Sequence, residues 1–161
     1  MSCRSTGPSR RSRGQALVEF AFVVPIFLLL LFGIIEFGRY VYTVQILNNA
    51  AREGARYAIV HGSESLNPTG PMPGGAPGSD IAGEAVKAVV RRFAVGVVGA
   101  NISFPPVDCV NGETSGPCWV PNNQRGNAVT VTVRATFNAL IPIVPLPPIT
   151  IDGASTLVIN N

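Results

Sequence analysis

Charged side chains are scarce in this sequence. Of its 161 residues, 13% are Asp, Glu, Lys or Arg and 47% are hydrophobic, whereas roughly a quarter of the residues in a typical soluble domain are charged. A chain of this length has room for one domain and an anchor, but not for two full cores. The shortage of charge therefore predicts that part of the chain lies in a membrane.

Histidine and cysteine are also rare. The single histidine is His61, and the three cysteines are Cys3, Cys109 and Cys118. Because zinc usually takes four ligands, we expect no metal site. The sequence has no G-x-S-x-G, phosphate-binding loop, H-E-x-x-H or paired-carboxylate arrangement. We therefore expect neither enzymatic activity nor a cofactor, and we interpret His61 as a helix-end cap or a solvated side chain.

The excess of positive charge is confined to the first fourteen residues. They hold four arginines, and no acid precedes Glu19. After Gly14, eight basic and nine acidic side chains leave a formal charge of −1. A nucleic-acid-binding protein would gather basic residues on a folded face, so no nucleic-acid partner is expected. Residues 1–14 are too polar to bury apolar surface and are predicted to form a disordered basic leader.

One long stretch of the chain is almost free of charge. Residues 15–35 read QALVEFAFVVPIFLLLLFGII, in which Glu19 is the only charged residue. About 20 helical residues cross a hydrocarbon core of roughly 30 Å, so we predict a transmembrane helix over residues 15–36 in a lipid bilayer. A cleaved secretory signal would have a shorter apolar stretch and then a small-residue cleavage site, which is missing here. Arginines on one flank predict a cytoplasmic N-terminus and an extracytoplasmic C-terminal domain.

Two residues within this stretch need an explanation. Glu19 follows Gln15 by one helical turn, so both residues share a face. If the chain were cut between Gly14 and Gln15, the new α-amino group would be within reach of the Glu19 carboxylate. Otherwise this acid meets the terminal amine of a neighbouring subunit, or reaches toward the lipid headgroups. Pro25 removes a backbone donor and leaves the carbonyl of Ala21 unpaired, which predicts a kink.

The residues around this stretch resemble a known family. Gly14, followed by Glu19 and Phe20 at the start of an apolar helix, resembles the processing site of type IV pilins, in particular the tight-adherence (type IVb) class. Over about residues 11–60 the chain resembles the TadE-like family of minor pilins, or pseudopilins. The residues that carry this resemblance are Glu19, Phe20, Pro25, Glu36, Phe37, Gly38 and Arg39, and the run AAREGAR with Ala51, Arg52, Gly54 and Arg56.

The resemblance implies a structural role in a pilus. A prepilin peptidase would remove the leader after Gly14, and Glu19 would neutralise the new terminal amine during subunit packing. The partners would be other pilin or pseudopilin subunits and the pilus secretion platform, in a system for tight adherence and cell adhesion. The protein would then be a single-pass protein of the bacterial inner membrane. The alternative is an uncleaved single-span envelope protein that displays a binding head.

Helical periodicity continues beyond the apolar stretch. Residues 37–61 lack proline and are predicted to form an extracytoplasmic helical stem. Its small residues allow a close approach of another subunit or, as we favour, of the protein's own sheet. These residues are Ala50, Ala51, Gly54 and Ala55. Glu36 and Arg39 are spaced for an ion pair at the boundary of the membrane.

A small α+β head is predicted over residues 80–161, after a Gly/Pro-rich loop at 62–79. Asp80 is expected to be the N-cap of an amphipathic helix. The apolar stripe of this helix would comprise Val86, Val89, Val90, Phe93 and Val97, with Lys87, Arg91 and Arg92 outside it.

Alternating side chains predict three strands in the head. They cover residues 100–104, residues 129–137 and, with a bend at Asp152-Gly153, residues 149–159. Such alternation is typical of an antiparallel sheet with one covered face, and the amphipathic helix and the stem would provide the cover. Cys109 and Cys118 are predicted to form a disulfide that stabilises the head by about 2–3 kcal/mol.

Overall fold

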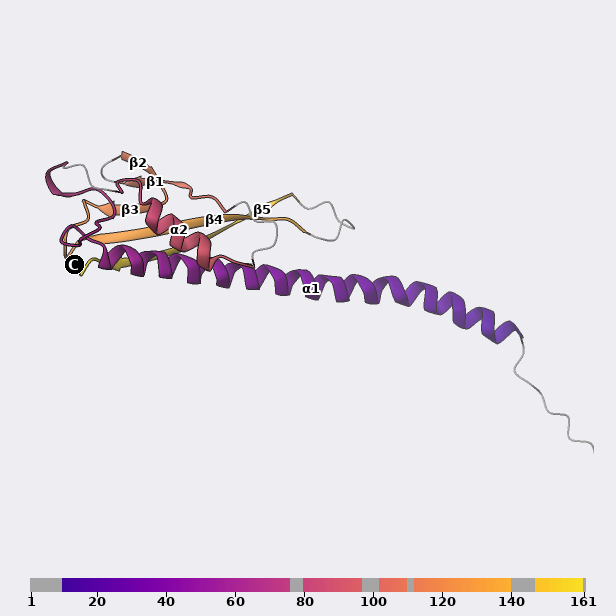
Figure 1. Ribbon diagram of the computed structural model, residues 1–161. Helices are drawn as coiled ribbons and strands as arrows, with labels where there is room; N and C mark the ends of the chain where they lie inside the picture. The colour runs from indigo at the N-terminus through magenta and orange to yellow at the C-terminus, as the bar shows by residue number, and fades with distance from the viewer. Residues whose placement is uncertain (1–9, 76–79, 97–101, 110–111, 140–146, 161) are drawn as a thin grey trace, which may run out of the picture. The chain divides into compact units, whose positions relative to one another are not determined.

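The computed structural model describes residues 10–75, 80–96, 102–109, 112–139 and 147–160 (Figure 1). The elements are helix α1 (Arg10–Val60), a 3-10 turn (Pro73–Gly75), helix α2 (Glu84–Phe93) and strands β1 (Pro106–Cys109), β2 (Gly112–Ser115), β3 (Pro117–Val120), β4 (Ala128–Phe137) and β5 (Ile149–Val158). They form two compact units, Met1–Arg39 and Tyr40–Asn161. The long apolar helix, the second helix and the antiparallel three-stranded sheet confirm the predicted α+β class.

The first unit contains the N-terminal part of α1. The helix begins at Arg10 and therefore includes the last five residues of the predicted leader. Arginine is a good helix former, which favours this extension. Residues 1–9 of the predicted leader, with Cys3, lie outside the described residues.

In the second unit, β4 is the middle strand of the sheet, whose order is β3-β4-β5. Val129, Val131, Val133 and Ala135 on β4 are fully buried, and the residues between them are partly exposed. The alternation predicted for residues 129–137 is therefore confirmed. One face of the sheet is covered and the other is open to solvent.

Strand β5 pairs with β4 along its whole length, and Gly153 pairs with Val133. The bend predicted at Asp152-Gly153 is therefore wrong. Gly153 is buried, and a Cβ atom at this position would lie 2.6 Å from the carbonyl carbon of Leu47 on α1. The missing side chain thus lets the helix backbone approach the strand closely.

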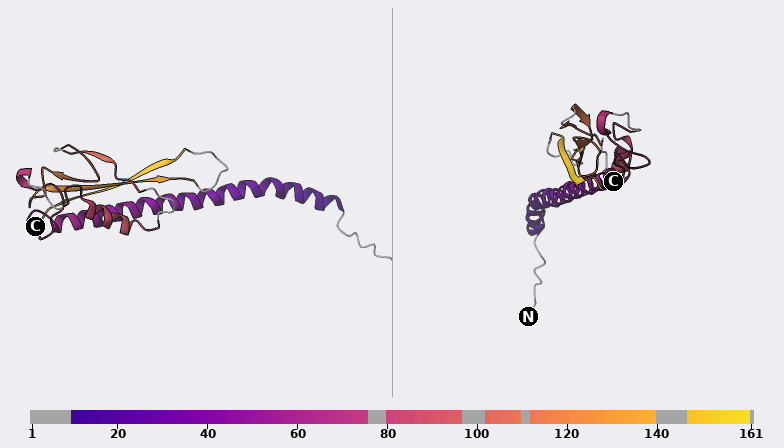
Figure 2. Two further views of the ribbon diagram at one scale, coloured as in Figure 1. Left: turned by 45° about the horizontal axis from the view of Figure 1, so that its top comes forward. Right: turned by 90° about the vertical axis from the view of Figure 1, so that its left-hand side faces the viewer.

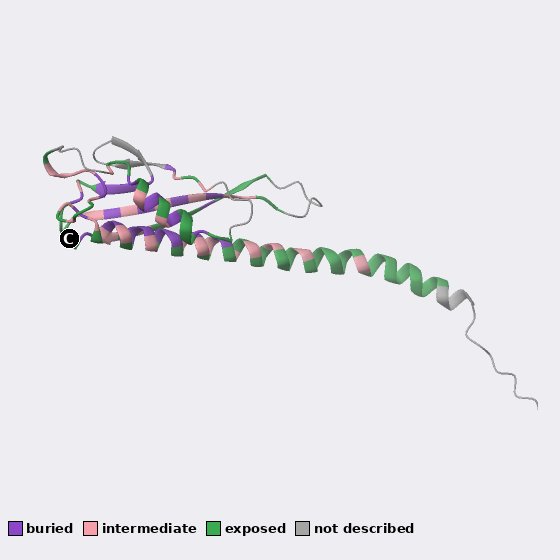
Figure 3. Cartoon of the chain, in the orientation of Figure 1, coloured by how far each residue is buried: buried purple, intermediate pink, exposed green. Residues whose placement is uncertain are grey.

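The C-terminal part of α1 and α2 together cover the buried face of the sheet (Figure 2). A Cβ atom on Gly54 would lie 2.5 Å from Val90 Cγ2 on α2 and 3.4 Å from Val131 Cγ1 on β4. Figure 3 shows buried bands along this part of α1. The fully buried residues of α1 are Leu47, Ala50, Ala51, Ala55 and Ala58. The small residues therefore pack against the protein's own helix and sheet, as expected.

The third strand of the sheet is β3, which was not predicted. The strand expected at residues 100–104 is wrong in its described part, where Ser103 forms a single bridge with Arg134. Residues 100 and 101 lie outside the described residues. β3 instead contributes Trp119, which is 2% exposed. Its indole packs against the backbones of Gly70 and Gly83, both of which have positive φ angles. Strands β1 and β2 pair separately as an antiparallel hairpin, and β1 lies against β3.

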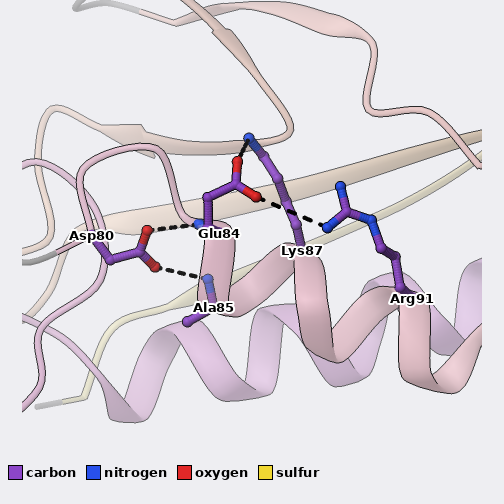
Figure 4. Close-up of polar contacts among 5 residues, drawn as sticks. All are labelled: Asp80, Glu84, Ala85, Lys87 and Arg91. Atoms are coloured by element: carbon purple, nitrogen blue, oxygen red, sulfur yellow. Dashed lines mark hydrogen bonds and ion pairs between the residues drawn. The ribbon is translucent and has the colours of Figure 1, made fainter.

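The N-terminus of α2 is capped by Asp80, although not from the expected position. The geometric N-cap is Gly83, and the Asp80 carboxylate accepts hydrogen bonds from the backbone N–H groups of Glu84 (2.7 Å) and Ala85 (2.9 Å) (Figure 4). Two amides that the helix itself cannot satisfy are therefore paired.

The predicted burial of Lys87 and Phe93 is wrong, because the lysine is buried and the phenylalanine is exposed. Lys87 is 6% exposed, whereas Phe93 is 52% exposed. The lysine lies beside Gly116 and Phe104, which cover this side of α2. Its ammonium donates a hydrogen bond of 2.8 Å to Glu84, and this bond holds the pKa of the Glu84 carboxyl below its usual value. Val97, the last residue of the predicted stripe, lies outside the described residues.

The C-terminus of α1 is capped by His61. Nδ1 of His61 donates to the carbonyl oxygen of Tyr57 at 2.8 Å, and the two rings stack with centroids 3.9 Å apart. A carbonyl of the last turn is thereby satisfied. The predicted capping role of His61 is confirmed.

Candidate functional site

The N-terminal part of α1 has an uncovered apolar surface. The relative exposure of Phe20 is 65% and that of Phe22 is 74%, and Figure 3 shows this part of the helix as exposed. In the described part of the chain, α1 is the one helix that is long and apolar enough to cross a membrane. A water-soluble protein rarely leaves so large an apolar surface open.

Gly14, Gln15, Glu19 and Phe20 all lie on this exposed part of α1. Gln15 and Glu19 are one turn apart within continuous helix, so they share a face. Glu19 has no hydrogen-bond or ion-pair partner among the described residues. The peptide bond after Gly14 lies inside α1, five residues from its start.

Pro25 lies within α1, and the helix continues through it. Its nitrogen carries no proton, so it cannot bond to the carbonyl of Ala21. Inside a membrane such a carbonyl is commonly satisfied by neighbouring helices or by small local adjustments. The kink expected at Pro25 stays a prediction.

An ion pair marks the end of the apolar stretch. Nη1 of Arg39 donates to Oε2 of Glu36 at 2.7 Å, and the two side chains are 28% and 19% exposed. The i, i+3 pair is therefore present where the sequence predicted it, and it neutralises both charges in place. Gly38 lies between them in open space, because a Cβ atom there would meet nothing within 4 Å.

The AAREGAR run divides between two faces of α1. Ala51 and Gly54 are buried in the core, while Arg52 and Arg56 are exposed. Helical geometry explains the division, because residues one and two positions apart point in different directions. The small residues of the run are therefore accounted for by packing, and its arginines are not.

The exposed face of this run forms one side of a groove of about 500 Å³. α1 contributes Asn49, Arg52, Glu53 and Arg56, and β5 contributes Ser155, Thr156 and Leu157. Glu53 and Arg56 are 3.6 Å apart, and Arg52 has no ion-pair partner among the described residues. Sequence reasoning missed this groove because it depends on β5, which is about a hundred residues away along the chain.

Cys118 is buried and disulfide-bonded. The side chain of Cys109 lies outside the described residues, so its pairing with Cys118 stays a prediction. In the part of the chain that the structure describes, no three His, Cys, Asp or Glu side chains come together as metal ligands.

Comparison with known proteins finds a family match over the part of α1 that carries these residues. Residues 14–56 match the family model of the TadE-like proteins. This range includes Gly14, Glu19, Pro25, the Glu36–Arg39 pair and the AAREGAR run, so the resemblance drawn from the sequence is confirmed there. No curated protein and no solved structure matches the chain.

Proposed function

We propose that this chain is a membrane-anchored, pilin-like structural subunit that takes part in assembling a tight-adherence pilus or a related secretion system. One observation carries the proposal. Within the segment that matches the TadE-like family, a single helix joins an uncovered apolar stretch to a stretch that forms the core of a folded head. This arrangement suits a subunit that is held in a bilayer and presents its head outside, without performing chemistry itself.

The anchor is residues 15–36, and the membrane is the bacterial inner membrane. Four arginines precede the apolar stretch, and basic residues stay on the cytoplasmic side. The stem at 37–61, the loop at 62–79 and the head at 80–161 are then extracytoplasmic. The disulfide predicted between Cys109 and Cys118 suits that compartment.

Processing by a prepilin peptidase would give Glu19 its role. Cleavage after Gly14 creates an α-amino group on Gln15, one helical turn from Glu19. The pairing of this cation with the carboxylate, in the same subunit or in a neighbouring one, offsets the cost of placing an acid in a membrane. The other partners are then pilin subunits and the secretion platform.

Terminal sequencing of membrane-extracted protein tests the processing. An N-terminus at Gln15 is expected, and an intact leader in cells that hold the peptidase contradicts it.

In cells that hold the peptidase, Glu19→Gln should leave membrane insertion intact and reduce pilus assembly. Glu64→Gln, which alters an exposed acid in the loop outside the membrane, is the matched control and should assemble normally. Normal pilus assembly by Glu19→Gln, at the level of the Glu64→Gln control, would contradict the role of Glu19 in subunit packing.

The second candidate is an uncleaved envelope protein that displays a binding head. It is favoured by the start of α1 at Arg10, which places the Gly14–Gln15 bond within a helix. Proteases need an extended chain, so cleavage requires the first turns of α1 to open. For the first candidate, Gly14 makes that opening easier, because glycine weakens a helix interior by about 1 kcal/mol relative to alanine.

A further inference from the structure

The exposed aromatic side chains of the second unit, Tyr40–Asn161, gather at one end of it. In the described part of Tyr40–Asn161, the exposed aromatic residues are Tyr40, Tyr42 and Phe93. The others are wholly or partly covered, and they are Tyr57, Phe104, Trp119 and Phe137. Tyr40 is the residue at which α1 enters this unit, so the exposed rings mark the end that follows the apolar stretch along the chain.

Contacts within the second unit place these residues on two sides of α1. On one side, the Tyr40 ring meets the Phe137 ring edge-on, with centroids 5.9 Å apart, and Phe137 pairs with Ile149, which is 44% exposed. On the other side, Tyr42 is next to the chain that leaves α2, because a Cβ atom on Gly96 would lie 3.2 Å from its hydroxyl oxygen.

Two further residues extend this second side. Tyr42 itself is 55% exposed, Phe93 is 52% exposed, and Val95 is 75% exposed. We call Tyr40, Tyr42, Phe93, Val95 and Ile149 the collar. A set of large apolar side chains that is exposed around one end of a domain indicates contact with something apolar.

The charges near the collar favour a lipid surface as its partner. Arg91 and Arg92 are in the last turn of α2, toward the collar, and Asp80 and Glu84 are at its other end. Arg91 is paired with Glu84 at 3.9 Å, whereas Arg92 has no ion-pair partner among the described residues. Glu36, the acid that precedes the collar along α1, is neutralised by Arg39. The collar end is therefore free of uncompensated acids among the described residues, as a contact with anionic phospholipid requires.

We propose that the collar lies in the lipid headgroup layer and fixes the depth and orientation of the head at the membrane surface. The inference rests on the membrane anchoring proposed above. Tyr40 and Tyr42 follow Glu36 by four and six residues, a helical rise of about 6 and 9 Å. The headgroup layer begins where the hydrocarbon ends and is roughly 5–8 Å thick on each side, so the backbone of Tyr40 lies within it and that of Tyr42 at its outer edge. Tyrosine rings are enriched at this boundary because they have an apolar body and a polar tip.

Tryptophan fluorescence of the full-length chain in phosphatidylcholine–phosphatidylglycerol vesicles tests the collar. The chain has one native tryptophan, and Trp119 is buried against Gly70 and Gly83, so its emission can be subtracted. Tyr42→Trp is expected to lose emission when the lipids are brominated near the headgroup. Leu66→Trp is the matched control, because Leu66 is fully exposed beyond the opposite end of α1. It should lose no emission.

A second probe and an anchoring control complete the experiment. Ile149→Trp tests the other side of the collar and serves if Tyr42→Trp does not fold. Phe27→Trp lies in the apolar stretch and should be quenched by deeply brominated lipid. If Phe27→Trp is quenched and the folded collar probes behave like Leu66→Trp, the collar inference is overturned while the anchoring stands. If Phe27→Trp is not quenched, the anchoring itself fails. Emission from the collar that is shifted to the blue yet insensitive to bromination would assign the surface to another protein subunit and also overturn the inference.

Discussion

At the residue scale, Gly153 marks the place where strand β5 meets the backbone of α1. Gly153→Ala is predicted to destabilise the protein by about 1–3 kcal/mol, the usual cost of overpacking a core, because its Cβ atom would collide with the backbone at Leu47. The helix backbone cannot relieve this clash by changing rotamer, as a flexible side chain could. The measurement is denaturant unfolding of the detergent-solubilised chain, followed by the fluorescence of Trp119.

Gly38→Ala is the matched control for that substitution. A Cβ atom at Gly38 meets nothing within 4 Å, and alanine favours a helix over glycine by about 0.5–1 kcal/mol. The control should therefore unfold at the same or a slightly higher denaturant concentration than the parent chain. Equal unfolding midpoints for Gly153→Ala and the parent would refute the close approach of β5 to α1.

A surface ion pair of the sheet makes stability depend on pH. Two nitrogens of Arg134 donate to the two carboxylate oxygens of Asp152, each at 2.7 Å. These bonds hold the pKa of the Asp152 carboxyl below its ordinary value of 3.8 and raise the pKa of Arg134. The stabilisation is therefore fully present above the ordinary pKa of Asp152, and it is lost as the pH falls through the lowered value.

Asp152→Asn isolates this contribution. The free energy of unfolding of the parent should exceed that of the variant at pH 7, and the difference should shrink as the solution is acidified below pH 4. Glu84, whose pKa is also lowered, is present in both proteins and cancels. Because both partners are partly exposed, the difference at pH 7 should also decrease in high salt. A difference that stays constant with pH would mean that the ion pair does not stabilise the sheet.

At the element scale, α2 depends on a cap that lies three residues before its geometric N-cap. Asp80→Ala removes both acceptors for the N–H groups of Glu84 and Ala85. Loss of such a cap costs about 0.5–2 kcal/mol. Hydrogen exchange should show faster opening of the first turn of α2, and Asp80→Asn, which keeps one acceptor oxygen, should be intermediate. Unchanged exchange in Asp80→Ala would contradict the capping role.

The bridge predicted between Cys109 and Cys118 ties β1 to β3. Alkylation of the unreduced, unfolded chain should label Cys3 alone, or no cysteine if the leader has been removed. Cys109→Ser should then lower the free energy of unfolding by about 2–3 kcal/mol, as expected for a short closed loop. Alkylation of Cys109 and Cys118 without a reductant would disprove this pairing.

Local pattern was sufficient for some elements of the fold and misleading for others. The alternation of β4 and the small-residue face of α1 were predictable, because each is a repeat within one element. β3 was not predictable, because it has only four residues, Pro117–Val120, is followed directly by Pro121 and shows no alternation. Residues 100–104 alternate better, yet of their described residues only Ser103 pairs with the sheet.

The burial of Lys87 and the role of Gly153 were missed for a related reason. Each depends on an element that is distant in sequence, namely the segment with Phe104 and α1, respectively. The candidate site follows the same rule. The Glu36–Arg39 pair and the outward arginines follow from helical spacing, whereas the groove between Arg52 and β5 depends on the tertiary fold.

At the scale of the whole molecule, α1 has two different surroundings. After Tyr40 one face of the helix is covered by a sheet and a second helix, and before Arg39 most of its apolar side chains are exposed. Removing apolar area from water is worth about 25 cal/mol per Å², so the uncovered part is stable only where lipid or other subunits surround it. A bilayer supplies that environment over the length of residues 15–36.

Alkaline extraction of membranes from cells that express the full-length chain tests this central claim most directly. High pH releases peripheral proteins and leaves integral ones in the bilayer. We predict that the chain stays in the membrane pellet and is released only by detergent. Recovery of the folded chain in the detergent-free supernatant would contradict the account.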